Sequence, residues 1–326
     1  MTNRCGTAPW RYGLICAAAA GGAHAQDAAT YPTRAVQIVV PYSTGTTADI
    51  LARLLGPKLS ERWKVSVVTD NRPGATGAIG IASVAKAAPD GHTLLIVVAS
   101  YAMIPAIYKT LAYDPIKNFA PVARLTTSGL ALVVHPQIPA KSVREFVRLA
   151  KRRPGELFYS TAGNGSAQHF AMELFKLEAG VNLVHVPYKG LSSALTDLMG
   201  GHVQATISTL QTVQPFVTSG RLRMLAATSV ERSSAFPDVP TLKEQGLTLE
   251  VDTWSGVLAP AATPASVIAK LNTDINALLQ QPDIREQLAR QGMSPTGGPP
   301  ERFGELLKSE LARWARVVEA AKIRID

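Results

Sequence analysis

The amino-acid sequence predicts an α/β protein of two lobes, each a mainly parallel β-sheet flanked by helices. The chain has 326 residues, 46% hydrophobic and 17% charged, which is enough for a large core and for two domains. Short β-branched runs alternate with amphipathic helical patterns, and this alternation is typical of parallel sheets covered on both faces. After residue 260 only helical patterns remain, and these helices need a sheet to cover.

The first sheet is predicted from a β-α-β-α-β pattern. Strands are expected at Val36–Val40, Val65–Val68 and Leu94–Val98, because these runs are short and rich in β-branched residues. Between them lie a segment with apolar residues on one face at 50–55 and a Gly/Ala-rich helix at about 78–87. Strands joined by helices in this way pair in parallel.

A second set of strands repeats this rhythm further along the chain, with helices between them. Two sheets fit the pattern better than one. The strands of this second set are expected at Leu130–Val134, Leu157–Ser160, Leu183–Val186, Val203–Ile207 and Met224–Ala227.

The C-terminal helices are expected to cover the first sheet and so to complete the first lobe. They span Pro264–Gln281, Asp283–Gln291 and Pro300–Ala321, the last with an apolar stripe that includes Phe303 and Trp314. The first lobe is then residues 26–123 plus 253–326, and residues 124–252 form an inserted second lobe. The chain crosses between the lobes twice, as a hinge requires.

The N-terminus, residues 1–25, has the layout of a secretory signal peptide. Arg4 and Arg11 supply positive charge, a short apolar run follows, and Ala23-His24-Ala25 forms a cleavage site, so the mature chain is expected to begin after Ala25. The predicted location is periplasmic. Both cysteines, Cys5 and Cys16, fall inside this leader, which leaves the mature chain without disulfides, thiol nucleophiles or cysteine-ligated zinc.

Charge and motifs exclude several functions. The formal net charge of +9 is small and dispersed, so no nucleic-acid partner is expected. The five histidines after the leader are scattered without metal-ligand spacing, and no P-loop or nucleophile elbow is present. We therefore expect no catalytic residues, no metal and no cofactor, although a Ser–His pair assembled from distant residues stays open.

Two similar loops predict an anion site. Tyr42-Ser43-Thr44-Gly45 and Tyr159-Ser160-Thr161-Ala162-Gly163 each follow a predicted strand and precede a helix. Hydroxyl- and glycine-rich turns at a helix N-terminus present backbone N–H groups to an anion. The alternative for any single residue is helix capping, because Thr46-Thr47-Ala48-Asp49 resembles a capping box and Ser166 suits an N-cap.

The motifs along the mature chain resemble one family over essentially its whole length. They include Asn71-Arg72-Pro73-Gly74, Asp90-Gly91-His92-Thr93, Gly163-Asn164-Gly165-Ser166, His185-Val186-Pro187-Tyr188-Lys189-Gly190 and Phe236-Pro237-Asp238-Val239-Pro240-Thr241. The chain resembles the extracytoplasmic solute receptors of tripartite tricarboxylate transporters, the Bug or TctC-like proteins.

This resemblance implies a periplasmic-binding-protein or "Venus flytrap" fold. It also implies a monomer without enzymatic activity. It implies a small carboxylate held between the lobes and delivered to a two-subunit inner-membrane permease. The ligand is a di- or tricarboxylate, an amino acid or an aromatic carboxylate, and these alternatives stay open.

The residues that the resemblance assigns to ligand binding lie mostly in the two loops. The family's proline and glycines in the first loop are replaced here by Thr44, Thr46 and Thr47. The full set is Tyr42, Ser43, Thr44, Gly45, Thr46, Thr47, Asp49, Ser160, Thr161, Ala162, Gly163, Asn164, Gly165, Ser166, Tyr188, Ser208 and Thr209.

Other residues and functions stay open. Arg72 and Lys189 either assist the anion or serve the turns that hold them, and Tyr101 and Trp254 either shape the cleft or pack in the core. Rival functions are a ligand-presenting accessory of a membrane signalling system and a hydrolase or lyase acting on a carboxylate.

Overall fold

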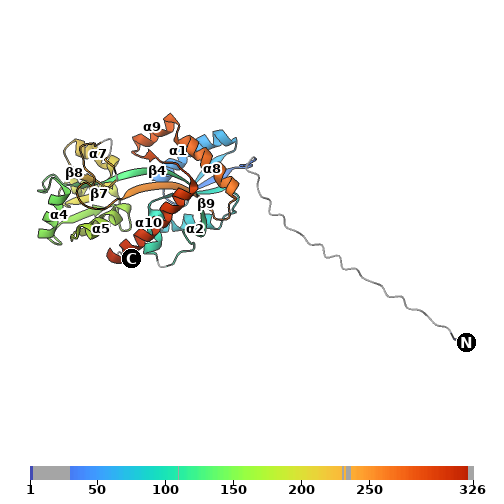
Figure 1. The fold of residues 1–326 in the computed structure, drawn as a ribbon, viewed down its shortest axis with the longest axis horizontal. Coiled ribbons are helices and arrows are strands. Elements are labelled where there is room, and N and C mark those ends of the chain that lie inside the picture. Colours follow the sequence, from blue (N-terminus) through green and yellow to red (C-terminus); the bar gives the residue numbers. More distant parts are fainter. Residues whose placement is uncertain (3–29, 109, 230, 233–235, 322–326) are drawn as a thin grey trace.

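Two sheets that share one long strand form the centre of the molecule (Figure 1). The computed structural model describes residues 1–2, 30–108, 110–229, 231–232 and 236–321. Almost all of the predicted signal peptide lies outside the described residues. The shared strand, β4 (Phe119–Val134), belongs to the first sheet through Gly129 and to the second from Leu130 onward.

The first sheet has the strand order β2-β1-β3-β9-β4. Strands β1 (Val36–Val40), β2 (Val67–Asn71) and β3 (Thr93–Val98) are parallel, and β9 (Asp252–Pro260) is antiparallel to both β3 and β4. The short β10 (Ser294–Pro295) pairs with β4. Each parallel strand is joined to the next through a helix, as the alternating pattern predicts.

The second sheet places three parallel strands beside the far end of β4. Strand β5 (Phe158–Thr161) lies between β6 (Val184–Pro187) and β7 (Ala205–Thr209), and it is parallel to both. Strands β7 and β8 (Arg223–Ala227) pair antiparallel with β4. The predicted α/β class with two lobes is therefore observed, and each sheet combines parallel strands with antiparallel ones.

Helices cover the faces of both sheets. Helix α10 (Pro300–Ala321) is the longest of those described. The others are α1 (Thr47–Trp63), α2 (Ala78–Ala85), α3 (Ser100–Ile107), α4 (Val143–Arg152), α5 (Ala167–Ala179), α6 (Leu191–Met199), α7 (Leu210–Thr218), α8 (Ala265–Leu279) and α9 (Pro282–Arg290). None of the helices within the described ranges is long and apolar enough to cross a lipid bilayer.

The strand predictions are confirmed for the short apolar runs and incomplete for the long strands. The run predicted at Leu130–Val134 is only the end of β4, and β9 was not predicted at all. Both missed segments contain residues that are uncommon in strand interiors, such as Pro121 in β4 and Gly256 in β9. In β4 the register shifts near Pro121, which accommodates the proline in the sheet.

Helix α10 packs against α3 and β4 and also reaches the second lobe. Trp314 of α10 lies edge-on to Phe170 of α5, with ring centroids 5.3 Å apart, and both rings are buried in one core. Arg313 donates a hydrogen bond to the backbone oxygen of Glu250. The apolar stripe of α10 is long enough to pack on both lobes, and Figure 1 shows the helix beside both parts of the sheet.

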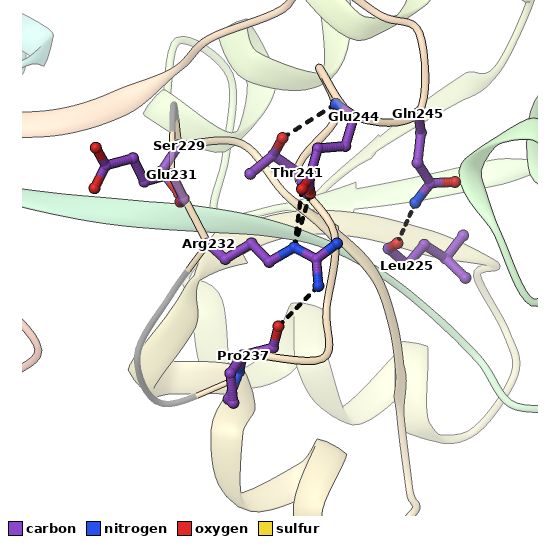
Figure 2. Close-up of polar contacts among 8 residues, drawn as sticks. All are labelled: Leu225, Ser229, Glu231, Arg232, Pro237, Thr241, Glu244 and Gln245. Carbon is purple, nitrogen blue, oxygen red and sulfur yellow. Dashed lines mark hydrogen bonds and ion pairs between the residues drawn. The ribbon is translucent and has the colours of Figure 1, made fainter.

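The segment after β8 is tied down by a small polar network (Figure 2). Arg232 donates to both carboxylate oxygens of Glu244 at 3.0 Å and to the backbone oxygen of Pro237 at 3.0 Å. Thr241 and Glu244 cap each other reciprocally, and Gln245 donates to the oxygen of Leu225 in β8 at 2.8 Å. The network fixes this return segment to the second sheet.

Candidate functional site

A cavity of about 500 Å³ lies where the two sheets meet, and it is lined by residues of both lobes. We call it the central cavity. Its lining is Tyr42, Thr46, Thr47, Ala48, Ile50, Val98, Ala99, Ser100, Thr126, Ser128, Ala167, Gln168, Thr209, Gln211, Thr212, Thr253, Trp254, Ser255, Arg290, Gln291 and Met293.

Four strand-to-helix junctions open on the central cavity. They follow β1, β3, β5 and β7 and lead into the N-termini of α1, α3, α5 and α7, through loops in the case of β1 and β5. Ligands in open α/β sheets bind at this edge of the strands. Residues at the N-termini of several helices therefore line one cavity, and the positive ends of their dipoles favour an anion there.

The first loop presents uncapped amides to the central cavity. Thr46 is the N-cap of α1, but its hydroxyl donates to the oxygen of Ser43 at 2.8 Å and does not cap the helix. The N–H groups of Thr47 and Ala48 precede the first intrahelical acceptor and receive no side-chain cap. Both residues line the central cavity.

Asp49, in the first turn of α1, anchors the first loop. Its carboxylate accepts hydrogen bonds from the backbone N–H of Gly45, from Arg53 and from Asn71, each at 2.9 Å. Burial alone would raise the pKa of Asp49, but these hydrogen bonds outweigh it and hold the pKa below its usual value. The carboxylate therefore stays ionised, and its charge is paired with that of Arg53.

The second loop reaches the central cavity at the first turn of α5. Ser166 caps this helix, because its hydroxyl accepts from the N–H of His169 at 3.3 Å. The N–H groups of Ala167 and Gln168 stay without an intrahelical acceptor, and both residues line the cavity. The two loops thus bring first-turn amides from opposite lobes to the same volume.

Hydroxyl and aromatic side chains complete the wall. The hydroxyls of Tyr42 and Ser100 are 2.9 Å apart, and those of Thr126 and Ser255 are 2.5 Å apart. Burial raises the pKa of Tyr42 to about 12, so its hydroxyl stays protonated at neutral pH. Trp254 is only 3% exposed and lies edge-on to Phe303, which makes it both a core residue and part of the wall.

The charge of the wall favours an anion. None of the lining residues is an Asp or a Glu, and the one cation among them is Arg290, an exposed residue that pairs with Glu286 at 2.6 Å. The described residues contain no group of three or more His, Cys, Asp or Glu that could hold a metal ion.

The structure brings some of the predicted binding residues to the central cavity and leaves others outside its lining. Tyr42, Thr46, Thr47 and Thr209 line it. Ser43, Thr44 and Gly45 are exposed beside it. The other predicted residues, which do not line it, are Asp49, Ser160, Thr161, Ala162, Gly163, Asn164, Gly165, Ser166, Tyr188 and Ser208.

The residues outside the lining are buried or hydrogen-bonded elsewhere. Ser160 and Ser208 are fully buried in their strands. Thr161 bonds His185 at 2.7 Å, and the hydroxyl of Tyr188 donates to Asp197 at 2.6 Å. The predicted residues of the second loop therefore do not line the cavity, and the residues that follow them, Ala167 and Gln168, do.

Arg72, Lys189 and Tyr101, whose roles the sequence leaves open, all lie outside the cavity lining. Arg72 pairs with Asp70 at 2.6 Å, as the turn interpretation expects, and lies outside the cavity lining. Lys189 is exposed and also lies outside it. Tyr101 is fully buried and donates to the oxygen of Pro115, so it belongs to the core.

Several lining residues were not predicted from the sequence. Ser100 follows β3 at a strand-to-helix junction like the other loops, and this position was the signal available for it. Gln168 and Gln211 lie just inside helices already placed beside predicted loops. Arg290 and Met293 come from the end of α9 and the turn after it, which no local pattern connects to the site.

Comparisons with known proteins agree on one family. The model of the tripartite tricarboxylate transporter family receptor, TctC, matches residues 51–323. BugT of Bordetella pertussis is 37% identical over 307 residues, which cover 93% of this chain and 94% of BugT.

Solved structures of similar sequence share the fold. The structure of R. palustris Rpa4515 with adipate has a TM-score of 0.76 and 38% identity, covering 90% of this chain and 99% of that one. MatC from Rhodopseudomonas palustris with bound malate has a TM-score of 0.73 and 32% identity, covering 88% and 100%.

Proposed function

The chain belongs to the tripartite tricarboxylate transporter receptor family, and from that premise we propose that it captures a small carboxylate in its central cavity and delivers it to a membrane permease of two subunits. The family is one of solute-binding receptors and not of enzymes. No residue therefore needs a catalytic role, and the work of the protein is to bind and release its ligand.

One observation supports this proposal most strongly: first-turn residues of α1 and α5, Thr47 and Ala48 from one and Ala167 and Gln168 from the other, line a single cavity from opposite lobes. A carboxylate has two oxygens that accept several hydrogen bonds, and helix N-termini stabilise its charge. Hydrogen bonds to a charged group contribute roughly 1.5 to 3 kcal/mol each, so a few such amides offset desolvation and the ordering of the lobes.

We propose that ligand binding closes the two lobes around the cavity. One body is built on residues 26–123 plus 253–326 and the other on residues 124–252, with residues 124–129 in the strand that connects them. Strand β4 changes sheets between Gly129 and Leu130, and β9 begins at Asp252. Gly129 and Asp252 pair with each other, so the two connections between the lobes lie side by side. Because a bound carboxylate contacts both lobes only when they are together, its binding favours the closed arrangement.

The ligand class follows from the cavity and from the relatives. A volume of about 500 Å³ suits a small organic acid. R. palustris Rpa4515 was solved with adipate and MatC with malate, which are both dicarboxylates. Here the first carboxylate meets the amides, and the rest of the ligand lies against Tyr42, Trp254 and the glutamines. The candidate ligands differ in this remaining part, which is a second carboxylate in a dicarboxylate, an amino group in an amino acid and a ring in an aromatic carboxylate.

The proposed location follows from the same role. A receptor that serves an inner-membrane permease in a bacterium works in the periplasm as a soluble monomer. The predicted leader of residues 1–25 would export the chain to that compartment.

A thermal-shift screen tests the proposal. Adipate, malate, aspartate, nicotinate and phthalate are compared with adipamide, which has the length of adipate but no charge. Ligand at 100 times its Kd stabilises the folded state by roughly 2.7 kcal/mol. We expect at least one carboxylate to raise the Tm and adipamide to leave it unchanged. Equal stabilisation by adipate and adipamide, or none by any carboxylate, would contradict carboxylate capture.

A further inference from the structure

The two cavity loops share one capping arrangement but differ in the side chain that completes it. In α1, the backbone N–H of Gly45 donates to Asp49 at 2.9 Å. In α5, the backbone N–H of Gly165 donates to Nδ1 of His169 at 3.2 Å. Asp49 and His169 each stand three residues after the N-cap of their helix, where a capping box normally has Glu or Gln.

His169 is held by contacts that favour a neutral imidazole. Its Nδ1 accepts a hydrogen bond, so the ring proton lies on Nε2. Its ring stacks on His185 with centroids 3.9 Å apart, and His185 in turn stacks on Tyr159 at 4.9 Å. Two protonated imidazoles at this distance would repel each other strongly.

The charged groups around the stack are already paired with each other. Glu173, on the next turn of α5, accepts from Tyr159 at 2.5 Å and from Lys176 at 2.7 Å. Burial lowers the pKa of both histidines, that of His185 to about 3. At His169 the charge of Glu173 opposes this shift and that of Lys176 adds to it, and the pKa stays below its usual value. Both rings are therefore neutral at physiological pH.

We propose that His169 is a positioning residue that caps the second loop without adding charge, so that the N-terminus of α5 keeps its positive field for the ligand's carboxylate. Its imidazole holds Gly165, and its backbone N–H holds the hydroxyl of Ser166, which fixes the first turn. The free amides of Ala167 and Gln168 then face the central cavity. An ionised Glu at this position would repel the anion, whereas a neutral imidazole does not.

His185 supports this arrangement from the neighbouring strand. It bonds the hydroxyl of Thr161 at 2.7 Å, and its ring covers that of His169. The second loop is thus fastened at both ends by neutral rings. The inference rests on the proposed function only where it concerns the ligand.

Three substitutions at one position separate the parts of the proposal. His169→Phe keeps a ring but cannot accept a hydrogen bond, His169→Gln keeps a neutral acceptor, and His169→Glu keeps an acceptor with a negative charge. His202→Gln is the control, because His202 is an exposed histidine of the same lobe. Circular dichroism and urea unfolding establish that each variant is folded.

The first measurement is amide hydrogen exchange over residues 160–168 in the ligand-free protein. Loss of one hydrogen bond is worth about 1 kcal/mol, so His169→Phe is expected to speed exchange about fivefold. His169→Gln should restore slow exchange, and His202→Gln should not change it. Unchanged exchange in His169→Phe would overturn the positioning role, whether or not any ligand is known.

The second measurement is adipate binding by calorimetry at low and high salt. A unit charge several ångströms from the ligand is expected to weaken binding about tenfold in His169→Glu compared with His169→Gln, and added salt should reduce the difference. Equal affinities in the two variants would overturn the electrostatic part. If the wild type binds none of the screened carboxylates, the proposed function fails while the exchange result still decides whether His169 positions the loop.

Discussion

The loops at the N-termini of α1 and α5 solve one problem with different chemistry. Both leave first-turn amides free at the central cavity, and both need a side chain that holds the preceding glycine in place. The first loop uses the carboxylate of Asp49, and the second uses the imidazole of His169. The carboxylate is paired with Arg53, so neither loop leaves an unpaired negative charge beside the proposed anion site.

The comparison shows two ways to anchor a loop without weakening the positive electrostatic field at the N-terminus of its helix. An ion pair within one helix neutralises the anchor of the first loop, while stacking against a neighbouring strand keeps the second anchor neutral. The first anchor depends on an ionised carboxylate and the second on neutral imidazoles. Removal of the carboxylate charge should therefore loosen the first loop, and protonation of the histidines should loosen the second.

The largest expected effect on stability is that of Asp49→Asn. The carboxylate is 3% exposed and accepts from Gly45, Arg53 and Asn71, so losing its charge should cost about 2 kcal/mol of unfolding free energy. Urea unfolding measures the loss, and hydrogen exchange should rise in residues 43–49 only. Asp283→Asn is the control, because this carboxylate is 49% exposed and its loss should leave stability unchanged. Faster exchange in both loops would show that they are not anchored independently.

Acid should release the second loop before the first. The unfolded chain protonates histidine near pH 6.5, while burial lowers the pKa of His169 and His185 in the folded protein. The unfolded state thus binds more protons as the pH falls below 6.5, and stability is lost toward pH 3. The contribution of Asp49 is lost only as the pH falls through its folded pKa, below 3.8.

Urea unfolding between pH 7.5 and 4.5 measures this difference. The double variant His169→Gln/His185→Gln should flatten the pH dependence of stability, and Asp49→Asn should leave its slope unchanged. The opposite pattern, in which Asp49→Asn flattens the slope over this range, would contradict the assignment.

The smallest expected effect compares the two N-caps. The hydroxyl of Ser166 caps α5, so Ser166→Ala should lower stability by about 1 kcal/mol. The hydroxyl of Thr46 does not cap α1, and Thr46→Ala should therefore cost less than about half as much. Equal losses in thermal unfolding would mean that the two helix starts are stabilised alike.

Local patterns were sufficient to find the two loops and most of the short strands. Strand-to-helix junctions carry hydroxyl and glycine residues that stand out in sequence, and parallel topology brings such junctions to one edge. The capping role of Asp49 was among the alternatives for the same reason. These patterns indicate where the backbone turns. They do not indicate which residues of the turn line the cavity.

The remainder of the site depends on contacts between distant segments. Arg290 and Met293 reach the cavity only because α9 and β10 pack beside β4. The stack of Tyr159, His185 and His169 joins two strands and a helix, and histidines that are scattered in sequence gave no sign of it. Strand β9 was missed because its residues, including Gly256, do not resemble a buried strand.

The central claim is that first-turn amides from both lobes hold one carboxylate, and proline substitution at the first helical position tests it most directly. Proline there removes a single N–H and suits the helix start, since Thr46 and Ser166 have extended backbones, with ψ of 162° and 157°. Thr47→Pro and Ala167→Pro delete amides at the central cavity. Ala265→Pro, at the exposed start of α8, is the matched control.

Calorimetric titration with adipate compares the three variants with the wild type. Loss of a hydrogen bond to a charged group predicts that Thr47→Pro and Ala167→Pro each weaken binding about 10- to 100-fold, with the fold retained. Ala265→Pro should bind as the wild type does. Wild-type affinity in both cavity variants would contradict the claim that these amides grip the ligand.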